Sequence, residues 1–250
     1  VNKIMQKESV LLNKLKALGL DENTIVVFTS DNGGVASGDA FSTSNAPLRG
    51  GKGYQWEGGI KEPYLIHVPG MAAGKIENPV IGMDFYPTLL ALTDQTQKPD
   101  QHVDGINLLP LMKGEKMPER NLFWHYPHYG NQGGEPSSII RKGDWKLIHY
   151  WEDEHNELYD LSSDGSERRD LALKKRKLTA EMESDLMSWL KETKASLPSY
   201  DPKYDLMKRQ KVLDNYEQVL LPRLEAERKQ MLTDTYEPNA DWWGSKYTKD

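Results

Sequence analysis

Apolar residues in the first half of the chain follow helical and strand-like spacings in turn. Residues 4–18 carry leucine and isoleucine at helical spacing, and Gly19 ends that pattern. Short apolar runs at residues 24–29 and 64–68 are typical of strands. A further helix is expected to follow Asp84, whose side chain suits its cap. This alternation predicts an α/β sheet, which we place in a first domain over residues 1–118.

The pattern changes after Pro118. Four short aromatic or β-branched runs predict a small antiparallel sheet. These runs span residues 122–126, 138–141, 145–150 and 157–161. A helix with one apolar face is expected next, capped by Thr179 and ended by Pro198. We therefore expect a second subdomain over residues 119–198.

Residues 199–250 form a third segment, in which spaced leucines predict a helix that is interrupted or restarted at Pro222. The mean hydropathy of −0.72 and the 37% hydrophobic content are low for a compact domain, and much of the polarity follows residue 160. A solvated helical extension, packed on the surface of the domain, accounts for this. A partner-binding arm is the alternative.

Polar side chains gather where the strand at residues 24–29 ends. Asp31 and Asn32 come directly after it, and open α/β sheets place their ligand sites at such strand ends. Two oxygen-bearing side chains beside glycines suit a hard divalent cation, but calcium takes about six to eight oxygens, so this pair cannot complete a site alone. Lys52 follows in a glycine-rich loop, from which it can reach an anion bound to that cation.

Three phrases in this order resemble the sulfatase family of the alkaline-phosphatase superfamily. They are Ser-Asp-Asn-Gly-Gly at 30–34, Pro-Leu-Arg-Gly-Gly-Lys-Gly at 47–53 and Glu-Gly-Gly-Ile-Lys-Glu-Pro at 57–63. Arg-Lys-Gly-Asp-Trp-Lys at 141–146 and Glu-Leu-Tyr-Asp-Leu at 157–161 are similar to phrases of the family's C-terminal subdomain. The resemblance implies an alkaline-phosphatase-like sandwich. This chain would hold the C-terminal part of its main sheet, together with the small antiparallel sheet and its helix.

The resemblance also implies roles for particular residues. Asp31 and Asn32 match the family's calcium ligands, with Mg²⁺ as the alternative metal. Lys52 matches a catalytic lysine that touches the sulfate and offsets the negative charge growing on the leaving oxygen. His125 and His128 lie among aromatic residues at a strand end and resemble a sugar-ring platform. We therefore expect a sulfated carbohydrate, or another sulfate ester, as the substrate.

The charged residues that flank Lys52 are expected to be structural. We expect Arg49 to pair with Glu57 and hold the shape of the loop. The Glu57 side chain can satisfy loop amides, while the two glycines after it permit close backbone approach. Direct contact of Arg49 or Lys61 with a substrate is the alternative.

The family's nucleophile is formylglycine, made from the first residue of a Cys/Ser-x-Pro-x-Arg motif that precedes the Ser-Asp-Asn-Gly phrase. The chain has no cysteine, and Ser-Leu-Pro-Ser-Tyr at 196–200 does not fit, because tyrosine replaces arginine and the phrase follows the last helix of the subdomain. We therefore expect the C-terminal portion of a sulfatase. A missing N-terminal segment, which a separate chain can provide, would supply the formylglycine, and the 250 residues alone are expected to be inactive.

Bulk properties narrow the remaining classes. A net charge of −6 and a pI near 5.6 argue against nucleic-acid binding, and no apolar run approaches the length of a membrane span. The chain starts without a signal-peptide pattern, but the resemblance implies a periplasmic or extracellular location. Two other functions stay open. One is a phosphoester or phosphonate hydrolase of the same superfamily, and the other is a catalytically inactive module that binds a glycan or a partner.

Overall fold

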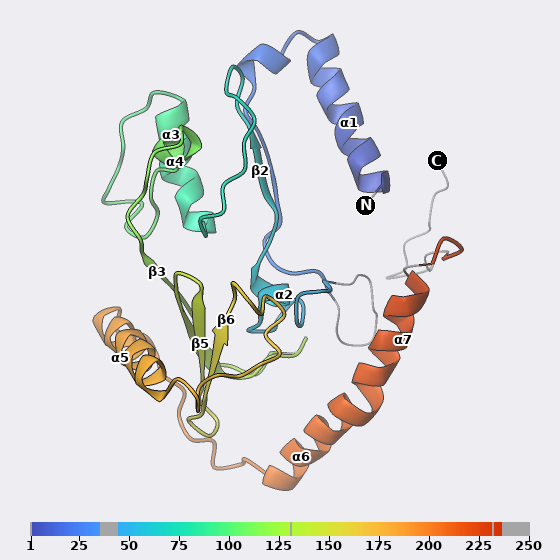
Figure 1. Ribbon diagram of the computed structural model, residues 1–250, viewed down its shortest axis with the longest axis vertical. Coiled ribbons are helices and arrows are strands. Elements are labelled where there is room, and N and C mark those ends of the chain that lie inside the picture. The colour runs from blue at the N-terminus through green and yellow to red at the C-terminus, as the bar shows by residue number, and fades with distance from the viewer. Residues whose placement is uncertain (1, 36–44, 131, 232, 237–250) are drawn as a thin grey trace. The chain divides into compact units, whose positions relative to one another are not determined.

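The computed structural model describes residues 2–35, 45–130, 132–231 and 233–236. The chain divides into two compact units, whose helices and strands are labelled in Figure 1. The first unit comprises residues 1–29 and 64–120, and the second comprises residues 30–63 and 121–250. The site phrases at 30–63 therefore belong to the same unit as the small sheet.

The first unit contains the predicted helix and both predicted strands. Helix α1 (Asn2–Ala17) is followed by Gly19, whose φ of +65° favours glycine. Strands β1 (Val26–Thr29) and β2 (Tyr64–His67) pair antiparallel, with Val26 opposite His67. The other elements are the 3₁₀ turns Asp21–Asn23 and Gly82–Asp84 and the helices α3 (Phe85–Leu92) and α4 (Leu109–Met112).

Asp84 does not cap α3 as the sequence suggested. Its own backbone is helical (φ −71°, ψ −17°), so its side chain lies over the preceding 3₁₀ turn, where it accepts a hydrogen bond from Ile81 N at 2.9 Å. The buried carboxylate also accepts a hydrogen bond from Ile106 N at 2.9 Å and forms an ion pair with Arg120. Asp84 thus joins three segments of the first unit.

One antiparallel sheet organises the second unit, and its four strands follow one another in chain order (Figure 1). They are β3 (Asn121–Tyr126), β4 (Ser137–Lys142), β5 (Trp145–Tyr150) and β6 (Asn156–Asp160). Each strand lies within one residue of its predicted run. Gly143, with a φ of +59°, makes the predicted tight turn between β4 and β5.

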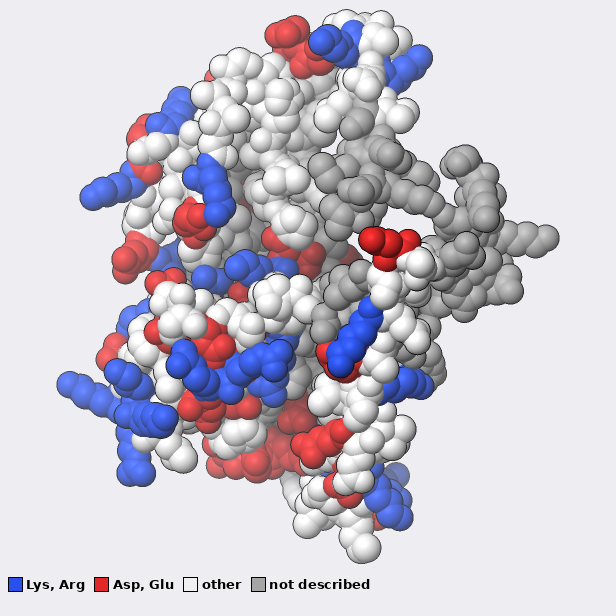
Figure 2. Space-filling model, turned by 45° about the vertical axis from the view of Figure 1, so that its right-hand side comes forward, with Lys and Arg blue, Asp and Glu red and all other residues white. Residues whose placement is uncertain are grey.

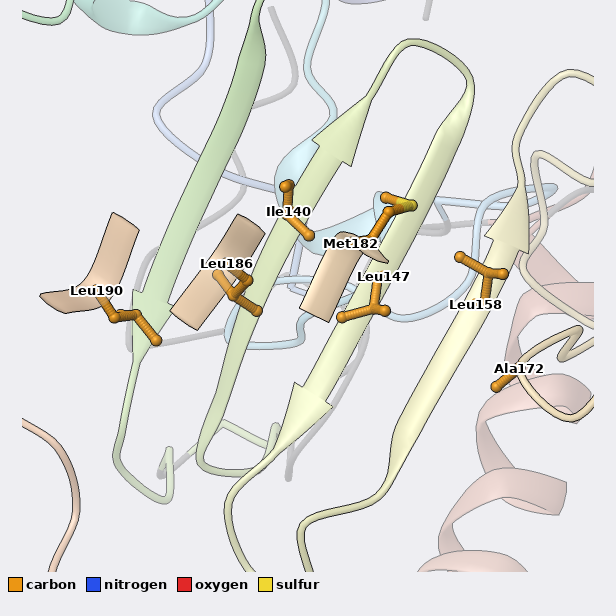
Figure 3. Packing of buried hydrophobic residues seen from close by; sticks show 7 residues of the cluster. All are labelled: Ile140, Leu147, Leu158, Ala172, Met182, Leu186 and Leu190. Atoms are coloured by element: carbon orange, nitrogen blue, oxygen red, sulfur yellow. The ribbon is translucent and has the colours of Figure 1, made fainter. Parts of the chain in front are cut away.

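The sheet separates two apolar clusters, because successive side chains of a strand point to opposite faces. One face packs on α5 (Arg176–Glu192), as Figure 3 shows. This cluster contains Ile140, Leu147, Leu158, Ala172, Met182, Leu186 and Leu190. The other face packs against Trp56 and Ile60 of the glycine-rich segment through Ile139, Ile148, Tyr150 and Tyr159. The segment that carries the candidate site is therefore fixed to the face opposite α5.

Helix α5 begins earlier and ends earlier than expected. Thr179 is not its cap, because the helix has already begun at Arg176 and the Thr179 amide donates to Lys175 O at 3.0 Å. The Thr179 hydroxyl instead donates to Ala172 O at 3.1 Å. The helix ends at Glu192, followed by Lys194 in the left-handed region (φ +53°), before Pro198 is reached.

Within its described residues, the tail is helical from Leu206 to Met231. Asp205 caps α6 (Leu206–Asn215) by accepting hydrogen bonds from two amides of its first turn. A π-helical turn over Tyr216–Leu220 precedes α7 (Leu221–Met231). Pro222 accounts for this irregularity, since it donates no amide hydrogen bond and its ring crowds the carbonyl four residues earlier. The aromatic end at Trp242–Trp243 lies outside the described residues.

Charged side chains of both signs are interspersed on the face drawn in Figure 2. Within the described residues, each helix is too short or too polar to cross a bilayer.

Candidate functional site

Backbone hydrogen bonds bring the expected metal pair next to the loop of Lys52. Gly33 N donates to Gly59 O at 3.0 Å, and Lys52 N donates to Gly34 O at 3.1 Å. Both bonds start or end in the two glycines that follow Asp31 and Asn32. The structure thus gathers three of the five sequence-predicted site residues in one segment. We call residues 45–56 the Lys52 loop.

Close packing of the backbone makes three glycines obligatory here. A Cβ atom on Gly33 would lie 1.9 Å from Gly58 O, and one on Gly58 would lie 2.4 Å from Arg49 O. A Cβ atom on Gly59 would lie 2.2 Å from Tyr54 O. A side chain at Gly33 would force the segment after Asp31 away from residues 57–60, and one at Gly58 or Gly59 would force those residues away from the Lys52 loop.

Asn45 joins the same two segments through its side-chain amide. Its Oδ1 accepts a hydrogen bond from Gly34 N at 3.2 Å, and its Nδ2 donates to Gly34 O at 2.9 Å and Gly50 O at 3.2 Å. This role could not be predicted from the sequence, because no local pattern links Asn45 to residue 34.

The site contains two neighbouring carboxylates, Asp31 and Glu62, and the ammonium of Lys52. Asp31 is exposed, while Asn32 and Lys52 are half-buried. Partial burial and, secondly, the Asp31 carboxylate raise the pKa of Glu62, so the two carboxylates lie close enough to repel each other. The Lys52 ammonium forms no ion pair with any residue that the structure describes.

Asp31 and Asn32 offer hard oxygen ligands of the kind that calcium prefers. No group of three or more His, Cys, Asp or Glu residues that could hold a metal occurs in the described part of the chain. The pair therefore fits the chemistry of a calcium site but fills only part of the six to eight positions such a site requires.

A buried ion cluster fixes α2 (Glu57–Ile60), which follows the Lys52 loop, to the sheet. Lys146 Nζ of β5 lies 3.0 Å from Glu57 Oε1 and 2.8 Å from Glu167 Oε1, and Arg141 of β4 lies 3.6 Å from Glu57 Oε2. The Glu57 amide donates to Glu167 Oε2 at 2.6 Å. Burial raises the pKa of Glu167, and the Lys146 charge opposes that rise. Two cations thus balance two carboxylates beneath the loop.

The expected Arg49–Glu57 pair is wrong. The Glu57 side chain points towards the sheet, where it forms an ion pair with Lys146. The Arg49 guanidinium lies over the Trp56 ring, 3.6 Å from its centroid, and donates at 3.1 Å each to Tyr159 Oη and to the carbonyl oxygen of Glu167. Sequence reasoning also missed Lys146. A lysine between apolar residues of a strand was the signal that could have found it.

His125 lies on the sheet face that packs against α5. It shares this face with Phe123, while its neighbour Trp124 joins the opposite cluster, beside the Lys52 loop. His125 Nδ1 lies 2.7 Å from Ser138 Oγ, and its Nε2 lies 2.9 Å from Ser196 O. Both ring nitrogens therefore have partners within the chain, and the structure does not bring His125 beside Lys52.

His128 lies in the β3–β4 connection and is exposed, with its ring edge-on to Tyr126 at a centroid distance of 5.5 Å. The same connection packs on the Lys52 loop. A Cβ atom on Gly134 would lie 2.1 Å from Gly53 O, and one on Gly133 would lie 2.2 Å from the Tyr54 ring. The segment that carries His128 therefore borders the residues directly after Lys52.

Comparison with known proteins identifies the family of this chain. The Sulfatase family model matches residues 9–95. A sulfatase of Formosa agariphila is 35% identical over 193 residues, which cover 70% of this chain and 34% of that relative. The chain belongs to the sulfatase family. It spans about a third of the length of this curated relative.

Solved structures show the same alkaline-phosphatase-like sulfatase fold. Ps i-CgsB in complex with k-i-k-neocarrahexaose is 32% identical, with a TM-score of 0.60 over 72% of this chain and 39% of that one. A protein solved in complex with its substrate D-glucosamine-2-N,6-O-disulfate is 28% identical, with a TM-score of 0.53 over 74% of this chain and 37% of that one.

Proposed function

We propose that the protein to which this chain belongs hydrolyses sulfate esters, with Lys52 in contact with the sulfate. The observation that carries the proposal is the hydrogen bond from Lys52 N to Gly34 O. In a chain of the sulfatase family, it ties the lysine loop directly to the segment after Asp31 and Asn32. The segments that carry Lys52 and the Asp31–Asn32 pair are thereby held together by a backbone hydrogen bond, which side-chain motion does not disturb.

Lys52 would act through its charge. Its ammonium has no carboxylate partner in the described part of the chain, so its positive charge is available to offset the charge that grows on the leaving oxygen as the S–O bond breaks. Asp31 and Asn32 would supply some of the ligands of a calcium or magnesium ion. When bound, that ion would place further positive charge beside the sulfate oxygens. We place the formylglycine nucleophile on a segment other than these 250 residues.

A sulfated carbohydrate is the substrate class that the comparisons favour. One similar protein has D-glucosamine-2-N,6-O-disulfate as its substrate, and another was solved in complex with k-i-k-neocarrahexaose. In this chain Tyr54 and Trp56 stack at 5.4 Å beside Lys52, and His128 lies on the adjoining connection. We propose that His128, rather than His125, contacts the sugar, because its segment borders the Lys52 loop, whereas His125 lies on the other face of the sheet with both ring nitrogens bonded. We propose a periplasmic or extracellular location for the enzyme, as the family resemblance implies.

The test uses a complete sulfatase that contains this chain. Lys52→Ala should lower turnover of a sulfated sugar by about two to three orders of magnitude, the usual loss when one transition-state charge contact is removed. Lys61→Ala, which changes an exposed lysine nine residues away on the same segment, is the control and should keep near-normal turnover. A Lys52→Ala enzyme as active as its control would refute the proposal.

The 250-residue chain alone is expected to hydrolyse no sulfate ester. Calcium-dependent turnover of an aryl sulfate by the purified chain would contradict this expectation. If the complete protein hydrolysed a phosphomonoester faster than any sulfate ester, the proposed sulfatase function would be wrong and a phosphoester hydrolase would be the better assignment.

A further inference from the structure

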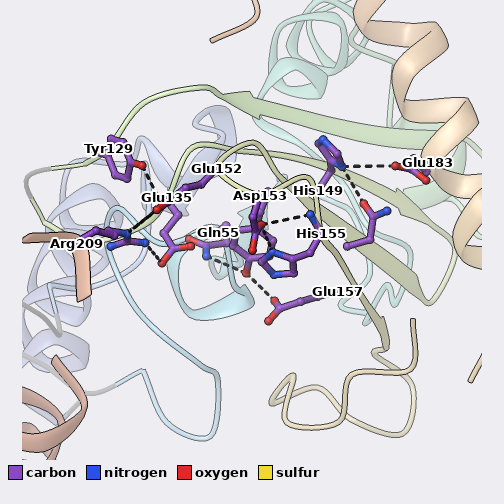
Figure 4. A network of polar contacts seen from close by, with 12 residues as sticks. Gln55, Tyr129, Glu135, His149, Glu152, Asp153, His155, Glu157, Glu183 and Arg209 are labelled. Carbon is purple, nitrogen blue, oxygen red and sulfur yellow. Dashed lines mark hydrogen bonds and ion pairs between the residues drawn. The ribbon is translucent and has the colours of Figure 1, made fainter. Parts of the chain in front are cut away.

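The tail helix α6 is clamped to the small subdomain through Arg209 (Figure 4). Arg209 Nη2 lies 2.5 Å from Glu135 Oε1, and Arg209 Nε lies 2.9 Å from Glu152 Oε2. The guanidinium carbon also lies 5.5 Å from the centroid of the Tyr129 ring. The Arg209 side chain is only 16% exposed, so these contacts are shielded from water more than ordinary surface ion pairs.

Glu152 is the second centre of this clamp. Tyr129 Oη donates to Glu152 Oε2 at 2.9 Å, and the Tyr204 hydroxyl donates to the other carboxylate oxygen. Glu135 and Tyr129 come from the β3–β4 connection, whereas Glu152 lies between β5 and β6. Arg209 therefore bridges the two connections, which Tyr129 and Glu152 also join directly, and Tyr204 adds a second contact between the tail and Glu152.

The clamped β3–β4 connection continues to the Lys52 loop. Glu135 directly follows Gly134, which packs against Gly53 O so closely that a Cβ atom would lie 2.1 Å away. The tail also reaches the loop directly, since the Tyr216 ring of the π-helical turn lies 6.3 Å from the Tyr54 ring. Both routes end at the two residues that follow Lys52.

We propose that tail residues 204–216 form a positioning strut for the Lys52 loop, with Arg209 and Tyr216 as its positioning residues. This inference rests on the role of Lys52 proposed above. Single π-helical turns occur frequently at functional sites, and here the turn presents Tyr216 to the loop. Gly133 and Gly134 carry no side chain that could anchor this connection, so contacts from outside it, such as that of Arg209 with Glu135, help to fix where it holds Gly53.

Hydrogen–deuterium exchange in the 250-residue chain tests the strut without any need for activity. The amides of Lys52 and Tyr54 donate hydrogen bonds to Gly34 O and Gly51 O, so exchange at these amides reports how well the loop is held. Arg209→Ala and Tyr216→Ala should accelerate exchange there by about tenfold, with β4 and β5 unchanged. Lys211→Ala, an exposed cation of the same helix, is the matched control and should leave exchange unaltered.

Arg209→Lys provides a second variant in case Arg209→Ala perturbs folding. It keeps the charge but loses the two-pronged contact with Glu135 and Glu152, so intermediate exchange is expected. Acceleration confined to residues 204–231, with the Lys52 loop as protected as in the unmodified chain, would overturn the proposal.

Kinetics of a complete sulfatase containing this chain separates positioning from mere stability. Arg209→Ala should lower kcat by about tenfold to a hundredfold with little change in KM, because a small displacement of a catalytic group affects the chemical step. Arg209→Lys should recover part of that kcat. Looser exchange with an unchanged kcat would overturn the positioning role. If Lys52→Ala also left kcat unchanged, the proposed function would fail, while the exchange result would still decide whether the strut exists.

Discussion

Lys146 Nζ lies 3.0 Å from Glu57 Oε1, between the four-stranded sheet and the segment that carries Lys52. The side chains are 1% and 6% exposed, so water does not solvate this pair. Glu167 shares the same ammonium at 2.8 Å. Loss of Lys146 would leave Glu57 with Arg141 alone, at 3.6 Å, and would remove the cation that pairs with Glu167, so buried negative charge would lose its compensation.

Lys146→Met should therefore destabilise the 250-residue chain by about 3–5 kcal/mol, the usual cost of breaking a buried ion pair from one side. Lys142→Met is the matched control, because Lys142 pairs with Glu181 and Asp185 at the surface and should cost less than about 1 kcal/mol. Denaturant unfolding of both variants provides the measurement. Equal losses would show that the buried cluster contributes no more than a surface pair.

Gly33→Ala should disrupt the contact between the metal segment and α2. The added methyl group would lie 1.9 Å from Gly58 O, and overpacking of this kind costs about 1–3 kcal/mol. Gly74→Ala, where nothing lies within 4 Å of the new Cβ atom, should be nearly neutral. Unfolding free energies of the two variants compare them directly, and a neutral Gly33→Ala would contradict the observed packing.

Asp31→Ala should weaken calcium binding by a complete sulfatase by at least about tenfold, since even outer partners of metal ligands cost that much when removed. Asp100→Ala, an exposed carboxylate of the other unit, is the control and should leave calcium affinity unchanged. Calorimetric titration with calcium measures both. An unaltered affinity in Asp31→Ala would remove Asp31 from the proposed ligand set.

His125→Ala should act on stability rather than on substrate choice. It removes two hydrogen bonds, each with a net contribution of about 0.5–1.5 kcal/mol, and should impair a sulfated sugar and a small aryl sulfate to the same extent. His128→Ala should impair the sulfated sugar selectively. The measurement is kcat/KM for the sulfated sugar relative to kcat/KM for the aryl sulfate, in each variant of a complete enzyme. A loss of activity in His125→Ala that is selective for the sugar would restore the expected role of His125 at the substrate.

Tyr129 should make the stability of the chain depend on pH at the alkaline end. Burial first, and then the hydrogen bond to Glu152, raise the pKa of Tyr129 to about 12, above the ordinary value of about 10. A raised pKa in the folded state contributes stability that is complete below the unfolded pKa and is lost as the pH rises through the folded pKa. The stability advantage over Tyr129→Phe should therefore shrink between about pH 10 and pH 12. Unfolding free energies across this range test the direction, and a growing advantage would contradict it.

The amino-acid sequence was sufficient wherever the signal is local. The strands of the small sheet lie within one residue of their predicted runs, because aromatic and β-branched residues favour a pleated backbone whatever surrounds it. The order of the glycine-rich phrases likewise indicated the sulfatase family. Local patterns were weaker at helix ends. Asp84 and Thr179 have the chemistry of caps, but their backbones are already helical, and that depends on the packing of neighbouring segments.

Only the tertiary structure decided which side chains meet. His125 and Trp124 are adjacent in sequence, yet the strand pairing sends one to α5 and the other towards the Lys52 loop. Glu57 selects Lys146, 89 positions away, over Arg49 nearby. A residue's type and spacing limit what it can bind. The partner of a residue depends on the sheet register, which decides the face on which each side chain lies. The register thereby also decides which charged side chains are buried and must be paired.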